Sequence, residues 1–230
     1  MASFETRHAQ GATLPLHRHR TAYAALVVDG EYLQFGPDGP VRCGPGSLLI
    51  HPHFHAHGNR FGARGARVLN LELPASAPTQ AFAAMQVGDM ASAREVFGGE
   101  AAGLPQLMRG TAPLPGAQGP DWQHAFVDAL RTGDTPLREI AHRVGVSLEH
   151  AGRQIRLAYG FTPQALRREL RWRAALALLA GDQPLSEVAT AAGFADQSHL
   201  TRTTRLCSGL TPAGLRCQIN CVQDRGPHRR

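Results

Sequence analysis

Short apolar runs separated by turn residues dominate the first third of the chain. Asp29–Gly30 and Gly62–Gly65 are two of the turn segments between them. The apolar runs are Ala22–Val28, Tyr32–Phe35, Ser47–Ile50 and Val68–Leu73. Runs of this length, bounded by glycine and proline, are typical of strands in a sandwich or small barrel. The pattern therefore predicts an all-β unit over residues 1–75.

Helical patterns replace the strand pattern further along. Within residues 76–129, the Ala-rich stretch 78–97 predicts one or two helices, and the Gly/Pro-rich stretch 98–120 predicts a linker. Behind Pro120–Asp121, which is a typical helix start, apolar residues recur at helical spacing: Trp122, Phe126 and Leu130. We expect this region to connect two domains.

An internal repeat occupies the C-terminal part. Leu137–Gly145 matches Leu185–Gly193 at an offset of 48 residues. At an offset of 49, the match continues with Gly160–Pro163 against Gly209–Pro212. Each copy predicts a short helix that ends at a glycine, and a second helix capped by Ser147 or Asp196. This is the helix-turn-helix layout, whose second helix enters the major groove of DNA. A plain helical bundle is the alternative interpretation.

The distribution of charge favours a DNA-binding function for the repeat. All 24 basic residues are arginine. Residues 1–120 hold 9 arginines and 8 acidic residues, whereas residues 121–230 hold 15 and 10. The basic half is the half that contains the repeat, so a polyanion such as double-stranded DNA suits it as a partner.

Residues 135–216 resemble the DNA-binding domain of the AraC/XylS family of bacterial transcription regulators. The resemblance is carried by Leu185-Ser-Glu-Val-Ala, by Ala192–Arg202 and by Gly209–Pro212, while Pro163–Gly181 is similar to the family's central helix. It implies that both recognition helices enter successive major-groove segments on one face of the DNA.

The resemblance also implies which side chains contact DNA. Base contacts are expected from Glu149, Arg153, Gln197, Ser198, His199 and Arg202, and phosphate contacts from Arg167 and Arg205. Three positions depart from the family pattern. Ala151 and Gly152 replace a core leucine and a longer polar residue, and Thr204 replaces a buried phenylalanine. We therefore expect the first unit to read DNA more weakly than the second.

The front half is rich in histidine, with seven of the twelve histidines before residue 58. His17 and His19 alternate on a predicted strand, so both rings point to the same face. Gly11–Gly30 resembles the first motif of cupin β-barrels, with Tyr23 in place of the usual glutamate, and Gly44–His57 resembles the second. The resemblance implies a sensory barrel with a ligand pocket formed by His17, His19, Tyr23 and His57.

Two chemistries are open for this pocket. His17, His19 and His57 form a set that suits a divalent transition metal such as zinc, iron or nickel. Alternatively, the histidines line a metal-free pocket for an organic ligand, which is favoured because a protonated Tyr23 is a poor ligand. Glu72 is an alternative carboxylate. At most some of three further histidines are expected to face inward: His51, His53 and His55.

Other classes of protein are excluded by simple features. The longest apolar run, Ala22–Val28, is far shorter than the roughly 20 residues of a membrane span. The N-terminus shows no basic segment followed by an apolar one, as a signal peptide would. The protein is therefore expected to be cytoplasmic. Its four cysteines are expected to be reduced thiols rather than a disulfide or zinc site: Cys43, Cys207, Cys217 and Cys221.

Together these features predict an α+β protein with a cupin-like β-barrel followed by an all-α tandem helix-turn-helix domain. The predicted boundaries are 1–75 for the sensor, 76–129 for the connector, 130–217 for the DNA-binding domain and 218–230 for a disordered basic tail. The predicted function is a sequence-specific transcription regulator modulated by a small-molecule effector, with a homodimer, and RNA polymerase if it activates, as further partners. The alternative is a metal-dependent cupin enzyme with an accessory helical domain. Two distinct recognition helices argue against an architectural protein without sequence preference.

Overall fold

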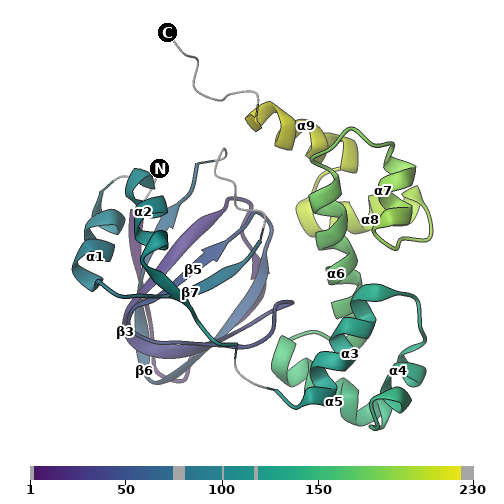
Figure 1. Cartoon of the computed structure of the whole chain (residues 1–230), viewed down its shortest axis with the longest axis horizontal. Helices are drawn as coiled ribbons and strands as arrows, with labels where there is room; N and C mark the ends of the chain where they lie inside the picture. Colours follow the sequence, from purple (N-terminus) through teal and green to yellow (C-terminus); the bar gives the residue numbers. More distant parts are fainter. Residues whose placement is uncertain (1–2, 75–80, 100, 117–118, 224–230) are drawn as a thin grey trace. The chain divides into compact units, whose positions relative to one another are not determined.

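The chain folds into two compact units, Met1–Gln118 and Gly119–Arg230 (Figure 1). The computed structural model describes residues 3–74, 81–99, 101–116 and 119–223. The first unit, called the sheet unit below, is built mainly of strands, and the second, the helical unit, is built of helices. The predicted α+β class is therefore confirmed.

An antiparallel sheet of eight strands forms the sheet unit. The strands pair in the order β1-β6-β3-β5-β7-β8, with β2 on β6 and β4 on β3. Their bounds are β1 (Ser3–His8), β2 (Thr13–Arg18), β3 (Tyr23–Phe35), β4 (Val41–Cys43), β5 (Ser47–His51), β6 (Ala56–Glu72), β7 (Ala83–Val87) and β8 (Thr111–Pro113). Over the described residues this order does not return from β8 to β1, so the predicted closed barrel is not formed. A single bridge between Val41 and Gly116 joins the segment after β8 to β4.

Two expected turns lie inside long strands instead. Asp29–Gly30 falls within β3 and 62–65 within β6, and the register between these strands shifts on either side of Gly30. Gly30 has a φ of +73°, and a Cβ there would lie 2.1 Å from the carbonyl oxygen of Gly65. Only glycine tolerates this close approach, so here glycine marks a bend between paired strands rather than a chain reversal.

Both faces of β3 are buried, which explains its continuous apolar run. One face contributes Ala24, Leu26 and Val28 to a core that also contains Phe97 and Leu104. The opposite face contributes side chains to a second core, which surrounds the cavity described below: Ala25, Val27 and Tyr32. Burial of alternate residues on two faces removes the polar positions that a half-exposed strand would show.

The predicted connector over 76–129 is wrong for most of its length. Strands β7 and β8 extend the sheet, and helices α1 (Met90–Gly98) and α2 (Leu104–Arg109) lie on one side of it with the short 3-10 turn Ala101–Gly103 between them (Figure 1). The physical reason is that Val87, Phe97 and Leu104 are buried in the first core, which the Gly/Pro content of the segment obscured. Residues 76–80 lie outside the described residues.

Seven helices form the described part of the helical unit. They are α3 (Asp121–Thr132), α4 (Leu137–Arg143), α5 (Leu148–Tyr159), α6 (Pro163–Leu178), α7 (Leu185–Ala191), α8 (Gln197–Ser208) and α9 (Pro212–Gln223). Helix α6 runs between the group α3–α5 and the group α7–α9 (Figure 1). Because α9 extends to residue 223, the first part of the predicted disordered tail is helical, while residues 224–230 lie outside the described residues.

The repeated turn is confirmed in both copies. Gly145 and Gly193 have φ values of +75° and +78°. The side chain of Ser147 accepts a hydrogen bond from the backbone N–H of His150, and Asp196 accepts one from that of His199. Left-handed glycines and side-chain caps therefore fix the angle between the two helices of each copy.

In the part of the chain that the structure describes, no helix combines the length and apolar character needed to cross a membrane.

We expect a fragment that begins at Gly119 to fold without the sheet unit. Its core is formed within the unit, and both tryptophans, Trp122 and Trp172, belong to it. Far-ultraviolet circular dichroism should show a helical spectrum, and tryptophan fluorescence should follow one cooperative unfolding transition. A soluble fragment without cooperative unfolding would contradict the assignment of this unit as an autonomous domain.

Candidate functional site

A cavity of about 200 Å³ opens on the inner face of the sheet unit. Its walls combine apolar side chains from the second core with polar side chains from β1, β2, β3, β5 and β6. The polar residues include Thr6, His17, His19, Tyr23, His51, His57, Asn70 and Glu72. A concave pocket in which polar groups converge between apolar side chains is typical of small-molecule sites.

Strand register brings the cavity histidines together. His17 on β2 pairs with His57 on β6, and Tyr23 on β3 pairs with His51 on β5. The hydroxyl oxygen of Tyr23 lies 2.9 Å from Nε2 of His57. The structure thus places all four predicted pocket residues, including His19, around one cavity, and it adds His51.

Two overlapping sets of three histidines have ligand nitrogens within 4.8 Å of one another. The outer triad, His17, His19 and His57, is the set expected from the sequence. The inner triad consists of His51, His55 and His57, and all three of its side chains are buried. The sequence carried a signal for the inner triad, because His51, His53, His55 and His57 alternate, but alternation alone did not tell which rings turn inward.

A chain of hydrogen bonds from Asp38 through His55 to His51 determines the positions of the ring protons when the imidazoles are neutral. Nε2 of His55 lies 2.8 Å from a carboxylate oxygen of Asp38, and Nδ1 of His55 lies 3.0 Å from Nδ1 of His51. An ionised carboxylate only accepts, so Nε2–H of His55 donates to Asp38. In the neutral ring Nδ1 of His55 then accepts from Nδ1–H of His51, which leaves Nε2 of His51 as an acceptor.

Burial favours the neutral imidazole at His51, His57 and His19. Desolvation, together with the neighbouring histidines, lowers the pKa of His57 to about 2 and that of His51 well below its usual value. The pKa of His19 is also lowered, chiefly by burial. Neutral imidazoles are both hydrogen-bond acceptors and metal ligands, so this cavity suits either chemistry.

Tyr23 changes what the outer triad can hold. Burial raises the pKa of its hydroxyl, which therefore stays protonated and donates to Nε2 of His57. Nδ1–H of His57 in turn points toward the carbonyl oxygen of His55 at 3.4 Å. A metal bound through that Nε2 would have to displace the Tyr23 hydroxyl, so the outer triad fits a metal poorly where a carboxylate would have fitted it well.

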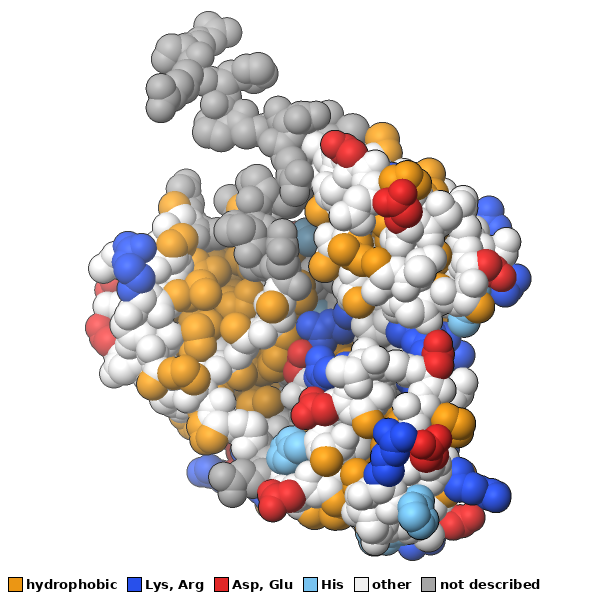
Figure 2. Space-filling view, turned by 45° about the vertical axis from the view of Figure 1, so that its right-hand side comes forward, with side chains coloured by type: hydrophobic (Ala, Val, Ile, Leu, Met, Phe, Trp, Pro, Cys, Tyr) orange, Lys and Arg blue, Asp and Glu red, His pale blue; other side chains and the backbone are white. Residues whose placement is uncertain are grey.

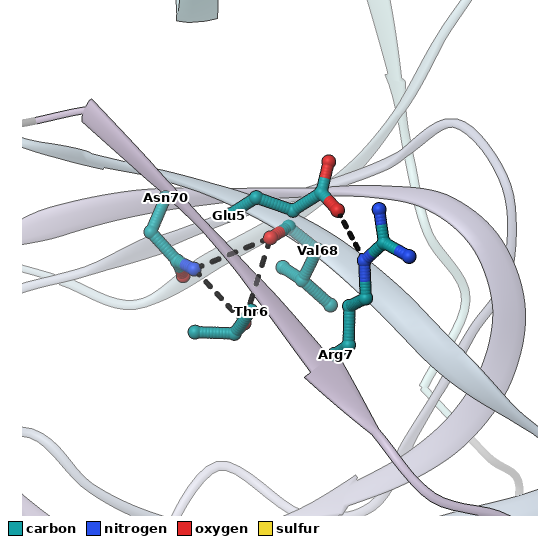
Figure 3. A network of polar contacts seen from close by, with 5 residues as sticks. All are labelled: Glu5, Thr6, Arg7, Val68 and Asn70. Carbon is teal, nitrogen blue, oxygen red and sulfur yellow. Dashed lines mark hydrogen bonds and ion pairs between the residues drawn. The ribbon is translucent and has the colours of Figure 1, made fainter.

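The rim formed by β1 and β6 is held by polar contacts (Figure 3). Nδ2 of Asn70 donates to Oγ1 of Thr6 at 3.1 Å and to the carbonyl oxygen of Val68 at 3.4 Å. Glu5 and Arg7, the neighbours of Thr6 on β1, form an ion pair of 2.8 Å. Thr6 and Asn70 line the cavity, so these bonds orient two of its polar groups.

The second candidate site lies on the recognition helices α5 and α8. Glu149, Arg153 and Leu157 follow one another at intervals of four residues, and the repeat places Ser198, Arg202 and Leu206 at the equivalent positions. All six are exposed, and the two leucines stand out with 61% and 71% of their surface exposed. Residues four apart share one helix face, so each helix presents a matched exposed stripe. The sequence pattern did not mark the two leucines as surface residues.

Charge is dispersed over the helical unit. Figure 2 shows arginine side chains in separate groups on this unit, with acidic side chains between them. Hydrogen bonds from its own backbone N–H and from the Ser147 hydroxyl lower the pKa of Glu149, so this carboxylate is ionised at the start of α5. The equivalent Ser198 is neutral, so the two stripes differ in charge.

His199 differs from the other expected base-reading residues. It is half-buried, and its ring meets that of Phe194 edge-on, with centroids 5.1 Å apart. The equivalent His150 contacts Trp122 in the first copy, at 5.4 Å. Two equivalent histidines against two aromatic rings favour a packing role, whereas Gln197 and Ser198 are exposed.

Arg167 is not the exposed phosphate contact that the sequence suggested. Its side chain is buried, with 7% of its surface exposed, and its guanidinium donates to the carbonyl oxygen of Thr135 at 2.5 Å. Arg216, the equivalent residue, donates to the carbonyl oxygen of Gln183 at 2.7 Å. Each carbonyl directly precedes the proline before the first helix of its copy. Both arginines therefore hold the helix-turn-helix units together.

The departures from the family pattern are accommodated in regular helices. Ala151 and Thr204 are fully buried, and the hydroxyl of Thr204 donates to the carbonyl oxygen of Leu200 at 2.8 Å. A buried hydroxyl is thus satisfied by its own helix where an aromatic ring was expected. Gly152 lies within α5, and a Cβ there would meet open space.

Comparison with known proteins identifies the helical unit. Residues 129–218 match the family model of a helix-turn-helix domain. The HTH-type transcriptional regulator RipA of Corynebacterium glutamicum is 33% identical over 125 residues, which are 52% of this chain and 38% of that protein. The chain thus spans about two fifths of the length of the curated relative it matches. The family match over residues 129–218 agrees with the helix-turn-helix layout that the repeated motif of the helical unit indicated.

Solved structures of three regulators are also similar to the chain. A regulator with an AraC-type DNA-binding domain from Chromobacterium violaceum shares 25% identity, with 43% of this chain and 91% of that chain covered and a TM-score of 0.40. ToxT from Vibrio cholerae O395 shares 9% identity, with 95% of this chain and 97% of that chain covered and a TM-score of 0.43. The DNA-binding domain of AdpA, in complex with a target DNA, shares 23% identity, with 47% of this chain and 100% of that chain covered and a TM-score of 0.44.

Replacing Arg167 should destabilise the helical unit rather than weaken a DNA contact. In Arg167→Ala the carbonyl of Thr135 loses its partner, which should lower the free energy of unfolding by about 1–3 kcal/mol. Arg168→Ala removes an exposed neighbour with the same charge and should change it by less than about 0.5 kcal/mol. Denaturant unfolding followed by tryptophan fluorescence measures both. Unchanged stability with weakened DNA binding would restore the phosphate assignment.

Acid should destabilise the sheet unit through its buried histidines. In the unfolded chain these imidazoles take up protons as the pH falls below about 6.5, whereas His57 in the folded state remains neutral down to about pH 2. The free energy of unfolding of a 1–118 fragment should therefore be constant above pH 7. It should fall toward pH 5 by up to about 1.4 kcal/mol per pH unit for each such histidine. His57→Phe should reduce the slope and His53→Ala should not; equal slopes in both variants would refute this cause.

Proposed function

We propose that the chain is a sequence-specific DNA-binding transcription regulator. The observation that carries this proposal is the pair of matched exposed stripes on two recognition helices of one AraC-type domain. RipA, the curated relative matched above, is named a transcriptional regulator, which favours this function over the enzyme alternative. Because both helices belong to one unit, a single chain presents two DNA-reading elements.

The geometry of α5 and α8 supports reading of two neighbouring groove segments. The first turn of each recognition helix has exposed residues, Glu149 in α5 and Gln197 and Ser198 in α8. Helix-turn-helix proteins contact base edges with this part of the helix. The 16-residue helix α6, about 24 Å long by its rise per residue, joins the two groups. We infer that the two contacts fall about one helical turn of DNA apart, roughly 10 base pairs.

The chemistry of the stripes suggests a role for each side chain. Arg153 and Arg202 suit the paired acceptors of a guanine edge, and the ionised Glu149 suits the amino group of cytosine. The exposed Leu157 and Leu206 suit apolar contact with thymine methyl groups. In the second copy, Ser198 is equivalent to Glu149 and Thr201 is equivalent to Gly152. The two halves of the operator should therefore differ in sequence.

Further residues complete the proposed interface, either by contact with DNA or by support of the residues that make it. Arg205 is exposed in the last turn of α8, where a guanidinium can contact a phosphate, and Gln197 at the start of α8 suits an adenine edge. His199 packs on Phe194, and Arg167 donates a hydrogen bond to Thr135. Both residues therefore stabilise the helices that carry the interface rather than contact DNA.

The cavity of the sheet unit is proposed to bind a small effector. The assigned ring protons leave Nε2 of His51 as an acceptor, and Nδ1–H of His17, which donates to the carbonyl oxygen of Pro15 at 2.9 Å, leaves its Nε2 facing the same cavity. A small polar molecule with hydrogen-bond donors fits such walls. We propose that its binding shifts the population able to engage DNA, with a homodimer and RNA polymerase as further partners of a cytoplasmic regulator.

The proposal is tested by comparing Arg202→Ala with Arg153→Ala. Both should lose discrimination between an operator, selected from random DNA with the full chain, and an unrelated duplex. The loss should be about 1–3 kcal/mol for Arg202, and smaller for Arg153 because Ala151 and Gly152 leave the first helix with fewer contacts. Fluorescence anisotropy at two salt concentrations measures specific and non-specific affinity separately.

Two control variants make the outcome decisive. Arg64→Ala removes one positive charge from the sheet unit and should leave discrimination unchanged, while Arg205→Ala should weaken both duplexes alike and reduce the salt dependence. Equal losses on both duplexes for Arg202→Ala would make that residue a backbone contact. Failure of selection to enrich any sequence would refute sequence-specific binding.

A further inference from the structure

We propose that the inner triad, His51, His55 and His57, is a binding site for a divalent transition-metal ion, with Asp38 orienting His55 from outside the coordination shell. This site shares His57 with the outer triad but uses two other histidines, and it goes beyond the proposed regulatory function. The chemical class is a borderline cation such as Zn²⁺, since three imidazoles and no thiolate or carboxylate face one another.

The distances within the inner triad suit a bound metal. Nδ1 of His51 and Nδ1 of His55 lie 3.0 Å apart, and all three ligand nitrogens lie within 4.8 Å. Two nitrogens on a tetrahedral zinc, each at 2.0–2.1 Å, are separated by about 3.3 Å. An ion entering here replaces the hydrogen bond between His51 and His55 with two coordinate bonds, and the ring proton of His51 moves to its own Nε2.

Asp38 supplies the outer contact that metal-binding histidines commonly have. It accepts from Nε2–H of His55 at 2.8 Å, which presents Nδ1 of the same ring to the ion. Carboxylate–histidine–metal arrangements of this kind fix the tautomer and raise the basicity of the ligand. In the outer triad, His17 donates to a neutral backbone carbonyl instead of a carboxylate. His57 belongs to both triads, and an ion bound through its Nε2 would displace the Tyr23 hydroxyl in either one.

A constrained backbone holds His55 in place. Phe54 has a φ of +58°, and it is the one described non-glycine residue with a left-handed backbone. Its N–H donates to the carbonyl oxygen of His19, and its own carbonyl accepts from the guanidinium of Arg18, both at 2.9 Å. Strain of this kind persists only where surrounding contacts enforce it, and it is concentrated at functional sites. Here it turns His55 back toward His51, which ends β5.

The site has both an entrance and room for a fourth ligand. His51 and His57 line the cavity, so an ion can reach the buried nitrogens from solvent through it. Three histidines leave one tetrahedral position open, and this position is available to water or to an effector. The ion would thus tie β5 to β6 at the wall of the effector pocket.

The test is metal binding to the untagged full-length chain after removal of metals with a chelator. Titration with Co²⁺ should give one ion per chain and the visible absorption bands of a tetrahedral nitrogen site. Competition with a chromophoric chelator gives the Zn²⁺ affinity. His55→Ala should abolish the cobalt spectrum, and Asp38→Asn, a substitution in an exposed turn, should weaken Zn²⁺ binding by about 10- to 100-fold.

Two matched variants separate this site from its alternatives. His19→Ala removes a ligand of the outer triad alone, and His53→Ala removes a histidine of the same segment whose Nδ1 lies 2.8 Å from the carbonyl oxygen of Arg20. Both should bind as the unaltered chain does. No stoichiometric binding, loss of binding in His19→Ala or His53→Ala, or full affinity in Asp38→Asn would each overturn the proposal. Circular dichroism of metal-free His55→Ala checks that its loss is not unfolding.

Discussion

The helical unit depends on a hydrogen bond from an arginine side chain to a backbone carbonyl, which occurs once in each copy of the repeat. Arg167 binds the carbonyl of Thr135 and Arg216 binds that of Gln183, at equivalent points of the two copies. Each bond ties the helix that follows a recognition helix to the start of the helix that precedes it. A guanidinium suits this role because it remains charged and offers several donors in a fixed plane. This bond acts together with the left-handed glycines and the side-chain caps to hold the recognition helix in the position that exposes its stripe.

The sheet unit depends in a similar way on register between distant strands. Pairing of β2 with β6 sets His17 against His57, and pairing of β3 with β5 sets Tyr23 against His51. A shift of one residue would turn every one of these rings to the other face of the sheet. The two-sided burial of β3 opposes such a shift, so the apolar cores hold the polar cavity in place. In this unit, the strand register that packs the apolar cores therefore also places the polar side chains of the cavity.

Duplication followed by divergence explains the chemistry of the recognition helices. The caps, the left-handed glycines, the arginine at the centre of each stripe and the exposed leucine after it are shared by both copies. Other positions differ between the two copies. The ionised Glu149 is replaced by Ser198 in the second copy, and Gly152 by Thr201. The scaffold is thus repeated while the surface is not, as expected of one chain that contacts two unlike stretches of DNA.

The sequence alone determined the helical unit because its signals are local. Gly145, Gly193, Ser147 and Asp196 act within one turn of the chain, and a repeat shows them twice. Contacts between distant residues decided the rest. Burial of Phe97 and Leu104 made most of the expected connector part of the sheet unit. Arg167 is buried where its guanidinium can donate to the carbonyl of Thr135, a contact between residues far apart in the sequence. The inner triad likewise depends on Asp38 and on the turn at Phe54, which no spacing of histidines reveals. Local patterns specify helices and turns, whereas only tertiary packing determines which polar side chains meet.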